Sequence, residues 1–415
     1  MMEKMNTREK VAYNTVAQLV GKAATTITTL LLTVLITRRF GPSGYGNFTI
    51  MLAYAALFYI VADFGLNAIA LRDFAVDEGK ILRYLKNLIG LRLVMALALF
   101  AIGATALVFF PYSRLVKMGV LIGLLTIFTQ ALFTTANAIF QVKLRYDLSV
   151  LADILGSVTI LTLAFLTIER SGELLPIVGS YVVGGVVMVA VSLYFVRRLV
   201  GGVGVGWDGG LWKYLFVSAL PLGITTIFTV ILQKADAILL SVMSGSTAVG
   251  LYGVAYKIFE FALVFPTFFV NSVYPIMVRH FKDGQERLLR TVRHSGMFLL
   301  AVAILGLVVG WVLSPLMIRV VAGPKFVESI RALRLLLLGL PIFYLSALFL
   351  WLMITLGKQK QIPFIYAIGA VSNVVLNLIF IPRYSFYGSA IITWASELLI
   401  LTLLAYFSLK SLQKN

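Results

Sequence analysis

Charged side chains occur inside long apolar segments of this sequence, where an ionised group has little access to water. Such groups are costly within a membrane and usually face the interior of a helix bundle or a binding site. They are Lys22, Asp63, Asp153, Lys234, Asp236, Lys257, Glu260 and Glu397. A lysine-lined cavity of low dielectric favours an anionic ligand, because a cation would be repelled there. The lysines therefore predict an anion-binding cavity.

The carboxylates in these segments have two interpretations that the residues alone leave open. Asp63, Asp236 and Glu260 either bind a coupling ion, H⁺ or Na⁺, or neutralise the lysines. Lys257 and Glu260 are three residues apart, so they can pair on one helix face. Lys234 and Asp236 are two residues apart and should point to different sides of their helix. For each lysine the simpler alternative is a side chain that extends to the membrane interface.

Two of the apolar segments carry polar residues at helical spacing. In segment 11–37 the polar residues are Asn14, Gln18, Lys22, Thr25 or Thr26, Thr29 and Thr33. In segment 213–241 they are Ser218, Thr226, Thr229 and Gln233. Steps of three and four residues place the first set on one helix face, and the second set lies on the helix at the equivalent position of the chain. We expect both faces to border a wet cleft between two halves of the protein. The alternative is ordinary helix packing, in which hydroxyl groups bond to their own backbone.

The composition is that of an integral membrane protein. Hydrophobic residues make up 60% of the 415 and charged residues 13%, with a mean hydropathy of +0.97. A soluble domain has about 45–50% apolar and about 25% charged residues. A transmembrane helix needs about 20 apolar residues. Twelve segments qualify, which predicts an all-α polytopic fold: 11–37, 47–70, 86–110, 118–141, 148–168, 174–196, 213–241, 249–277, 295–318, 333–357, 361–382 and 387–408.

Several classes of function are excluded by what the chain lacks. It has no cysteine, and its two histidines, His280 and His294, are too few for a histidine-based metal site. We therefore expect no metal, no cofactor and no catalytic residue. The net charge of +18 does not indicate nucleic acid binding, since no basic-aromatic module of any length stands outside the apolar segments. The connections are too short to hold a folded domain.

The distribution of basic residues predicts the orientation of the chain. If the N-terminus lies inside the cell, the inner segments hold 21 lysines and arginines and the outer loops hold 10. Cytoplasmic loops of membrane proteins carry the excess of Lys and Arg. Both termini are therefore predicted to be cytoplasmic, in a multi-pass protein of the cell membrane. The stretch 319–334 is the one outer region rich in basic residues.

The chain also contains an internal repeat at a shift of 204 residues. The shift places 41–48 (GPSGYGNF) on 245–252 (GSTAVGLY), and it places Asn67 on Asn271. Six helices in each half give both halves the same orientation, as in transporters built from parallel repeats. We expect an N-terminal six-helix lobe at 1–200, a cytoplasmic glycine-rich linker at 201–212 and a C-terminal six-helix lobe at 213–415, with a central cavity between the two lobes.

Short motifs in both halves resemble one family of membrane transporters. In chain order they are 39–46 (RFGPSGYG), 63–67 (DFGLN), 71–73 (LRD), 234–240 (KADAILL), 249–252 (VGLY), 373–377 (NVVLN), 381–382 (IP) and 387–390 (YGSA). Together they resemble the polysaccharide-biosynthesis (Wzx-like) flippases of the multidrug/oligosaccharidyl-lipid/polysaccharide exporter superfamily. The resemblance covers nearly the whole chain. The lipid II flippase branch has fourteen helices, whereas this chain shows twelve, which argues against that branch.

The resemblance implies a two-lobed flippase with a cationic cavity. Its substrate would be a polyprenyl-diphosphate-linked oligosaccharide, which moves from the cytoplasmic to the outer leaflet by alternating access. By position, Lys22, Lys234 and Lys257 would contact the diphosphate, with Arg72 and Arg145 near the cytoplasmic mouth. Asn14, Gln18 and Gln233 would line the cavity. The partners implied are membrane lipid and the lipid-linked substrate.

Two other functions remain as alternatives. A cation-coupled drug exporter of the same superfamily typically has a working carboxylate in its first helix, and segment 11–37 has none. A membrane-embedded glycosyltransferase or polysaccharide ligase commonly needs acidic residues in a sizeable outer loop, and the outer loops here are short and poor in acid. We therefore expect a transporter and not an enzyme.

Overall fold

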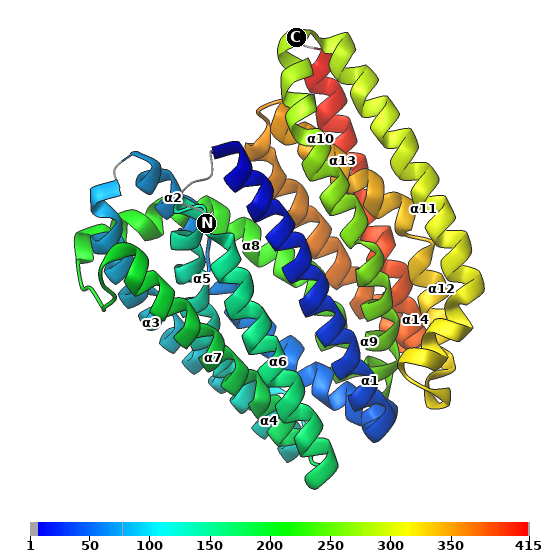
Figure 1. The fold of residues 1–415 in the computed structure, drawn as a ribbon. Helices are drawn as coiled ribbons and strands as arrows, with labels where there is room; N and C mark the ends of the chain where they lie inside the picture. Colours follow the sequence, from blue (N-terminus) through cyan, green and yellow to red (C-terminus); the bar gives the residue numbers. More distant parts are fainter. Residues whose placement is uncertain (1–6, 77, 414–415) are drawn as a thin grey trace. The chain divides into compact units, whose positions relative to one another are not determined.

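The computed structural model describes residues 7–76 and 78–413, and within these ranges the chain is helical without a strand (Figure 1). Apolar residues dominate every element, which suits helices whose backbone polar groups must be satisfied internally in lipid. The α-helices are α1 (Thr7–Val61), α2 (Leu66–Val76), α3 (Ile81–Ala106), α4 (Arg114–Leu124), α5 (Thr126–Val142), α6 (Tyr146–Arg170), α7 (Leu174–Val200), α8 (Gly209–Met243), α9 (Gly245–Ala262), α10 (Val264–Asp283), α11 (Gln285–Val321), α12 (Glu328–Leu337), α13 (Leu340–Thr355) and α14 (Ile362–Gln413).

The two longest elements each contain a break at which the chain changes direction. With 55 residues and 52 residues, straight helices would extend about 80 Å, far beyond the roughly 30 Å hydrocarbon core. Gly41 interrupts α1 at φ 65° and ψ −169°, and Ser385 interrupts α14 at φ 51° and ψ −138°. The positive φ at Gly41 carries no steric cost because glycine lacks a Cβ. Each element thus accommodates two of the predicted spans.

The number of membrane crossings agrees with the predicted twelve. Within the described residues, nine segments are long and apolar enough to cross a membrane, and α12 with α13 forms a tenth that bends by 41°. Two of the nine, 16–74 and 359–413, contain the breaks at Gly41 and Ser385. The chain is therefore a multi-pass membrane protein. The bend between α12 and α13 divides a segment expected to be one helix over 333–357.

The chain forms two compact units. The first comprises residues 1–39 and 50–227, and the second comprises residues 40–49 and 228–415. These units differ from the expected lobes at 1–200 and 213–415 in two places. The first turns of α8 pack with the first unit, and the stretch 40–49 packs with the second.

The glycine-rich stretch expected as a linker, 201–212, lies within the first unit because it docks on α3. The amide of Gly206 donates to the carbonyl oxygen of Lys86 at 2.7 Å. The side-chain oxygen of Asn87 accepts from the amide of Asp208 at 2.8 Å. Arg83 donates to the Asp208 carboxylate at 2.6 Å, and this hydrogen bond lowers the pKa of that carboxyl. These bonds hold the stretch on the helix instead of leaving it free.

A glycine contact inside the second unit supports the internal repeat. A Cβ on Gly46 would overlap the carbonyl oxygen of Ser246, and a Cβ on Gly250 would overlap the carbonyl oxygen of Pro42. Both glycines and both carbonyl residues are 204 positions apart. The two contacts are therefore equivalent: in each, a glycine of one repeat packs against the backbone carbonyl at the matching position of the other repeat. Only glycine allows the two backbones to approach this closely.

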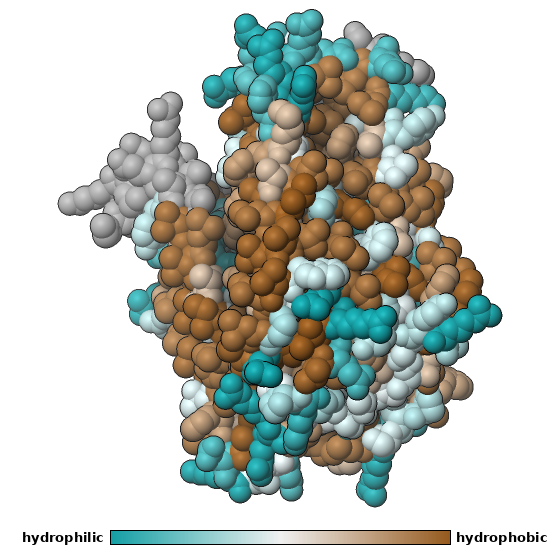
Figure 2. Space-filling view, turned by 90° about the vertical axis from the view of Figure 1, so that its right-hand side faces the viewer, coloured by the Kyte–Doolittle hydropathy of each residue, from teal (hydrophilic) through white to brown (hydrophobic). Residues whose placement is uncertain are grey.

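The face of the second unit that includes α11 is suited to lipid. Figure 2 shows this side with a broad hydrophobic band and a hydrophilic cap above it. Large apolar side chains along α11 are exposed, among them Met297, Phe298, Ile304 and Leu305. On a soluble protein an apolar surface of this extent would be unusual. Here it follows from the apolar composition of the helix.

Candidate functional site

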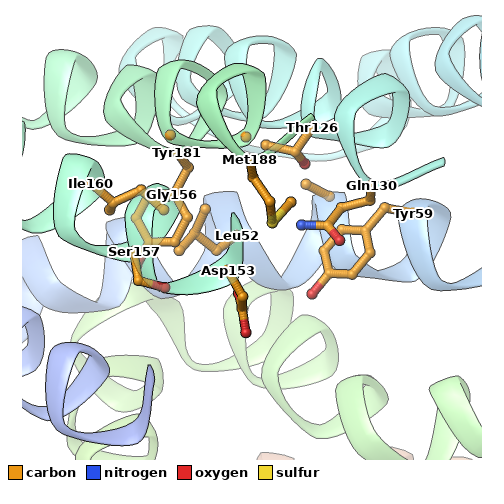
Figure 3. A pocket seen from close by; sticks show the side chains of 13 residues that line it. Leu52, Tyr59, Thr126, Gln130, Asp153, Gly156, Ser157, Ile160, Tyr181 and Met188 are labelled. Atoms are coloured by element: carbon orange, nitrogen blue, oxygen red, sulfur yellow. The ribbon is translucent and has the colours of Figure 1, made fainter. Parts of the chain in front are cut away.

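A cavity of about 200 Å³ lies within the first unit, between α1, α5, α6 and α7. Its polar lining includes Tyr59, Gln130, Asp153 and Tyr181, together with Thr126 and Ser157. Figure 3 shows Tyr59 and Gln130 side by side at one end of the cavity, while the carboxylate of Asp153 points away from Met188. The cavity therefore combines aromatic and amide groups with one carboxylate.

Lys22, which belongs to the predicted span 11–37, lies beside this carboxylate. Its side chain is exposed, and its charge acts on Asp153. The two helices are close at this level, since a Cβ on Gly21 of α1 would come within 2.7 Å of the side chain of Val150 on α6. Lys22 thus has a carboxyl group in its vicinity. Sequence reasoning placed both residues within spans but did not bring them together.

The other polar residues of the first helix serve different purposes. Asn14 is buried; its amide donates to the carbonyl oxygen of Leu144 at 2.7 Å, and its oxygen accepts from the amide of Tyr146 at 3.0 Å. Leu144 has a φ of 50°, which is strained for a residue other than glycine. The two hydrogen bonds of Asn14 therefore stabilise a strained turn between α5 and α6. Gln18 is exposed.

The threonines of the polar stripe bond along their own helix. The hydroxyls of Thr25, Thr29 and Thr33 each donate to the backbone carbonyl four residues earlier. This is the packing alternative stated for the stripe, and it satisfies these hydroxyls without water. On the second stripe, Thr226 bonds to Leu222 in the same way.

Asp63 is held in an ion pair with a fully buried arginine. Arg92 is 0% exposed, and its guanidinium donates to Asp63 at 2.5 Å, to the Asn67 side-chain oxygen at 2.8 Å and to the Thr135 hydroxyl at 2.8 Å. A buried cation needs such a partner, because an isolated charge is costly in a low-dielectric interior. The motif at 63–67 is thus held against α3, and Asp63 supplies the counter-charge of Arg92.

Arg72 and Arg145, expected near the cytoplasmic mouth, each pair with a neighbouring aspartate. Arg72 lies 3.1 Å from Asp73 and donates to the Tyr214 hydroxyl at 2.7 Å. Arg145 makes two bonds of 3.0 Å to Asp147. Both arginines lie in the first unit, and both have a local counter-charge.

The second unit contains a larger cavity, of about 320 Å³, between α8, α9, α10, α13 and α14. Its lining includes Gln233, Tyr366 and the carboxylate of Glu397. Glu397 is hydrogen-bonded to Ser346, which also lines the cavity. Sequence reasoning listed Glu397 among the charges within spans but gave it no role. The feature of the sequence that could have indicated a role for Glu397 is its position as the single carboxylate of the apolar segment 387–408.

The cavities of the two units use equivalent positions of the repeat. Leu52 and Tyr59 line the first cavity; Tyr256 and Leu263, each 204 positions later, line the second. The leucine and tyrosine exchange places between the two pairs. The repeat therefore extends to the cavity walls, although the chemistry of each wall differs.

A cluster of three charges lies on α8 and α9 in the second unit. Lys257 donates to Glu260 at 2.9 Å, as the three-residue spacing predicts. Lys234 is partly exposed, and its charge interacts with both Glu260 and Lys257. Two lysines and one glutamate leave a net charge of +1. The structure thus brings Lys234, Lys257 and Glu260 together, with Gln233 exposed next to them.

Asp236 points to the other side of α8, as expected from its separation from Lys234. It is 3% exposed, and it accepts hydrogen bonds of 2.8 Å each from Tyr252, Asn377 and Thr393. All three donors are neutral. Within the described residues no lysine, arginine or histidine forms an ion pair with Asp236.

The sequence matches a known family over most of its length. The family model described as "Polysaccharide biosynthesis protein" matches residues 8–281. The chain belongs to this family. A second family model, MatE, matches residues 221–379 of this polysaccharide biosynthesis protein.

Similar proteins exist among curated sequences and solved structures. A "Putative O-antigen transporter" of Shigella flexneri is 22% identical over 408 residues, covering 94% of this chain and 96% of the relative. The lipid II flippase MurJ in an inward closed conformation has a TM-score of 0.79 at 16% identity, over 97% of this chain and 89% of that one. An inward-facing multidrug resistance MATE transporter has a TM-score of 0.69 at 15% identity, over 94% and 95%. This polysaccharide biosynthesis protein therefore has the fold of these transporters.

The charges of this polysaccharide biosynthesis protein are distributed unequally. In the first unit, Lys22, Arg72 and Arg145 each have a carboxylate nearby. In the second unit, the cluster of Lys234, Lys257 and Glu260 has one more cation than anion. An anionic ligand would therefore find its strongest electrostatic attraction among the predicted site residues at this cluster.

Proposed function

We propose that this protein is a flippase that moves a polyprenyl-diphosphate-linked oligosaccharide from the cytoplasmic to the outer leaflet for cell-surface polysaccharide assembly. The observation that carries the proposal is the family match over residues 8–281. The full-length likeness to an O-antigen transporter supports it. The excess cation of the α8–α9 cluster adds a chemical reason, because a diphosphate is the most strongly charged part of such a lipid.

We propose that Lys234 makes the principal contact with the diphosphate. Lys257 has Glu260 at 2.9 Å, so the lysine whose charge remains in excess is Lys234. Lys22 would contribute less, since the carboxyl group of Asp153 lies near it. A lysine suits this role because its ammonium group donates up to three hydrogen bonds to phosphate oxygens.

Transport would proceed by alternating access, in which a cavity opens to one leaflet and then to the other. The fold supports this mechanism because related transporters have been solved in both states. The TM-score is 0.69 with an inward-facing MATE structure and 0.64 with an outward-facing one. In the proposed orientation both termini are cytoplasmic, and Arg72 and Arg145 lie near the cytoplasmic mouth.

Asp236 is the proposed site of a coupling cation, H⁺ or Na⁺. A carboxylate that is 3% exposed and bonded by neutral donors alone is costly to keep ionised. A bound proton or Na⁺ removes this cost. The oxygens of Asn373, Asn377, Ser389 and Thr393, which lie in one hydrogen-bonded network with Asp236, are hard ligands that suit Na⁺.

The proposal is tested with the purified full-length protein in liposomes that contain a labelled polyprenyl-diphosphate oligosaccharide. A membrane-impermeant reagent reports how much of the label lies in each leaflet over time. We expect protein-dependent movement of a lipid that is recovered chemically unchanged, as a transporter and not an enzyme requires. Absence of movement, together with ion-driven export of a cationic dye, would refute the flippase and favour a drug exporter.

A further inference from the structure

A cationic cavity lies in the second unit, apart from the charges assigned to transport. It has a volume of about 440 Å³ and is lined by His280, Arg287, Arg290, Thr291, His294 and Ser295. These residues belong to the end of α10 and the beginning of α11. Both histidines of the protein are therefore in this cavity, together with two arginines.

The cavity is held in shape by hydrogen bonds between its walls. His280 on α10 and the hydroxyl of Thr291 on α11 are 2.6 Å apart. Gln285, at the start of α11, donates to the backbone carbonyl of Leu412 near the end of α14 at 2.7 Å. Figure 1 shows the end of α14 beside the turn between α10 and α11. The two walls of the cavity, α10 and α11, are thus bonded to each other, and the start of α11 is bonded to the end of α14.

The positive charge of the cavity is only partly balanced. Asp283 lies 3.5 Å from Arg287, with both side chains well exposed, so this pair contributes little. Among the described residues, no carboxylate pairs with Arg290. A guanidinium group presents several N–H donors in a planar array that matches two oxygens of one phosphate. The unpaired arginine therefore favours a phosphate-bearing ligand.

The apolar surface next to the cavity indicates that the phosphate-bearing ligand is a lipid. Met297 and Phe298 are 50% and 47% exposed, and they follow His294 by about one helical turn, or roughly 5 Å. Ile304 and Leu305 continue the same surface. In Figure 2 the hydrophobic band begins below the hydrophilic cap of this unit. A phosphate in the cavity thus lies at the level where acyl chains would meet the band.

We propose that this cavity binds the headgroup phosphate of an anionic phospholipid, whose acyl chains lie along the exposed face of α11. Basic cavities between helices at the cytoplasmic side of a membrane protein are suited to such headgroups. The bound lipid would fix the depth of the second unit in the bilayer. This site is separate from the transported substrate and does not depend on the identity of that substrate.

The binding experiment uses the full-length protein in nonionic detergent. Fluorescent phosphatidylglycerol and fluorescent phosphatidylcholine with the same acyl chains are titrated, and anisotropy reports binding. The variant R287Q/R290Q removes both arginines of the cavity. The control variant R279Q/K282Q removes two exposed charges of the same helical end that do not line it.

We expect the wild type and the control variant to prefer phosphatidylglycerol. R287Q/R290Q should bind it roughly thirtyfold more weakly, since each basic residue contributes about one kcal/mol with an anionic lipid, equivalent to about fivefold. If the double variant does not purify in a folded form, R290Q alone should bind roughly fivefold more weakly. Equal losses in both double variants, or no preference in the wild type, would overturn the proposal.

Inorganic phosphate distinguishes a lipid headgroup from a free anion. Because the apolar face of α11 contributes to lipid binding, phosphate at the concentration of the lipid should leave the labelled phosphatidylglycerol bound. Displacement at equal concentration would assign the cavity to a soluble phosphate and overturn the lipid proposal.

Discussion

Replacing Lys234 with glutamine should impair transport more than removing the neighbouring ion pair as a whole. The cluster on α8 and α9 holds two lysines and one glutamate, with Lys257 and Glu260 at 2.9 Å. Lys234→Gln leaves that pair intact and lowers the net charge of the cluster from +1 to zero. The double variant K257Q/E260Q removes one charge of each sign and retains Lys234, so the net charge stays at +1.

The magnitude follows from the bond that would be lost. A hydrogen bond to a charged group contributes about 1.5–3 kcal/mol, which corresponds to roughly a 10- to 150-fold change in affinity. We expect Lys234→Gln to weaken apparent substrate affinity within that range. K257Q/E260Q should change affinity less than about fivefold, because exposed ion pairs contribute about 0–1 kcal/mol. Lys257→Gln alone should resemble Lys234→Gln, since it leaves Glu260 to repel the diphosphate.

The assay is the initial rate of leaflet exchange in proteoliposomes as a function of the density of labelled lipid-linked oligosaccharide. Equal reconstitution is checked by protein content and by a size-exclusion profile before insertion. The reasoning is refuted if K257Q/E260Q is as defective as Lys234→Gln. It is also refuted if Lys234→Gln transports with wild-type affinity, in which case the diphosphate binds elsewhere.

Three further substitutions test other parts of the structure. Asp63→Asn should lower the free energy of unfolding by about 3 kcal/mol in a denaturant titration, because the fully buried Arg92 loses its counter-charge. Adding Arg92→Met to the same chain should recover most of this loss. If it recovers none, the pairing of Asp63 with Arg92 is contradicted. Gly46→Ala should lower the free energy of thermal unfolding by about 1–3 kcal/mol or more, because its Cβ would overlap the backbone of α9. Gly179→Ala, whose Cβ meets nothing within 4 Å, should leave this free energy unchanged. Equal effects of the two substitutions would contradict the close contact. Asp236→Asn should make transport insensitive to an imposed Na⁺ or proton gradient, and retained gradient dependence would place the coupling site elsewhere.

Some local geometry could be predicted from the sequence because it depends only on helical spacing. The Lys257–Glu260 pair is three residues apart, and a helix brings such residues onto one face. The divergence of Lys234 and Asp236 follows from the same periodicity. The 204-residue repeat could be read from the match of 41–48 to 245–252 and of Asn67 to Asn271. The contacts of Gly46 and Gly250 give its physical reason.

Other features of the site depend on contacts between distant helices. Lys22 and Asp153 are far apart in the chain, and so are Asp63 and Arg92. Whether such charges meet depends on how each helix is rotated about its axis and which helices pack together. The cationic cavity of α10 and α11 is of the same kind, because its residues read in sequence only as a basic cytoplasmic connection.

The amino-acid sequence by itself determined that this chain resides in a membrane, crosses it about twelve times and is built from two similar halves. These properties follow from composition and periodicity, since lipid admits long apolar helices and each half repeats the same pattern. Only the tertiary structure decided which charges are neutralised and which remain available. The reason is that a side chain's charge acts over a few ångströms in space, and helix packing alone determines which groups lie within that distance.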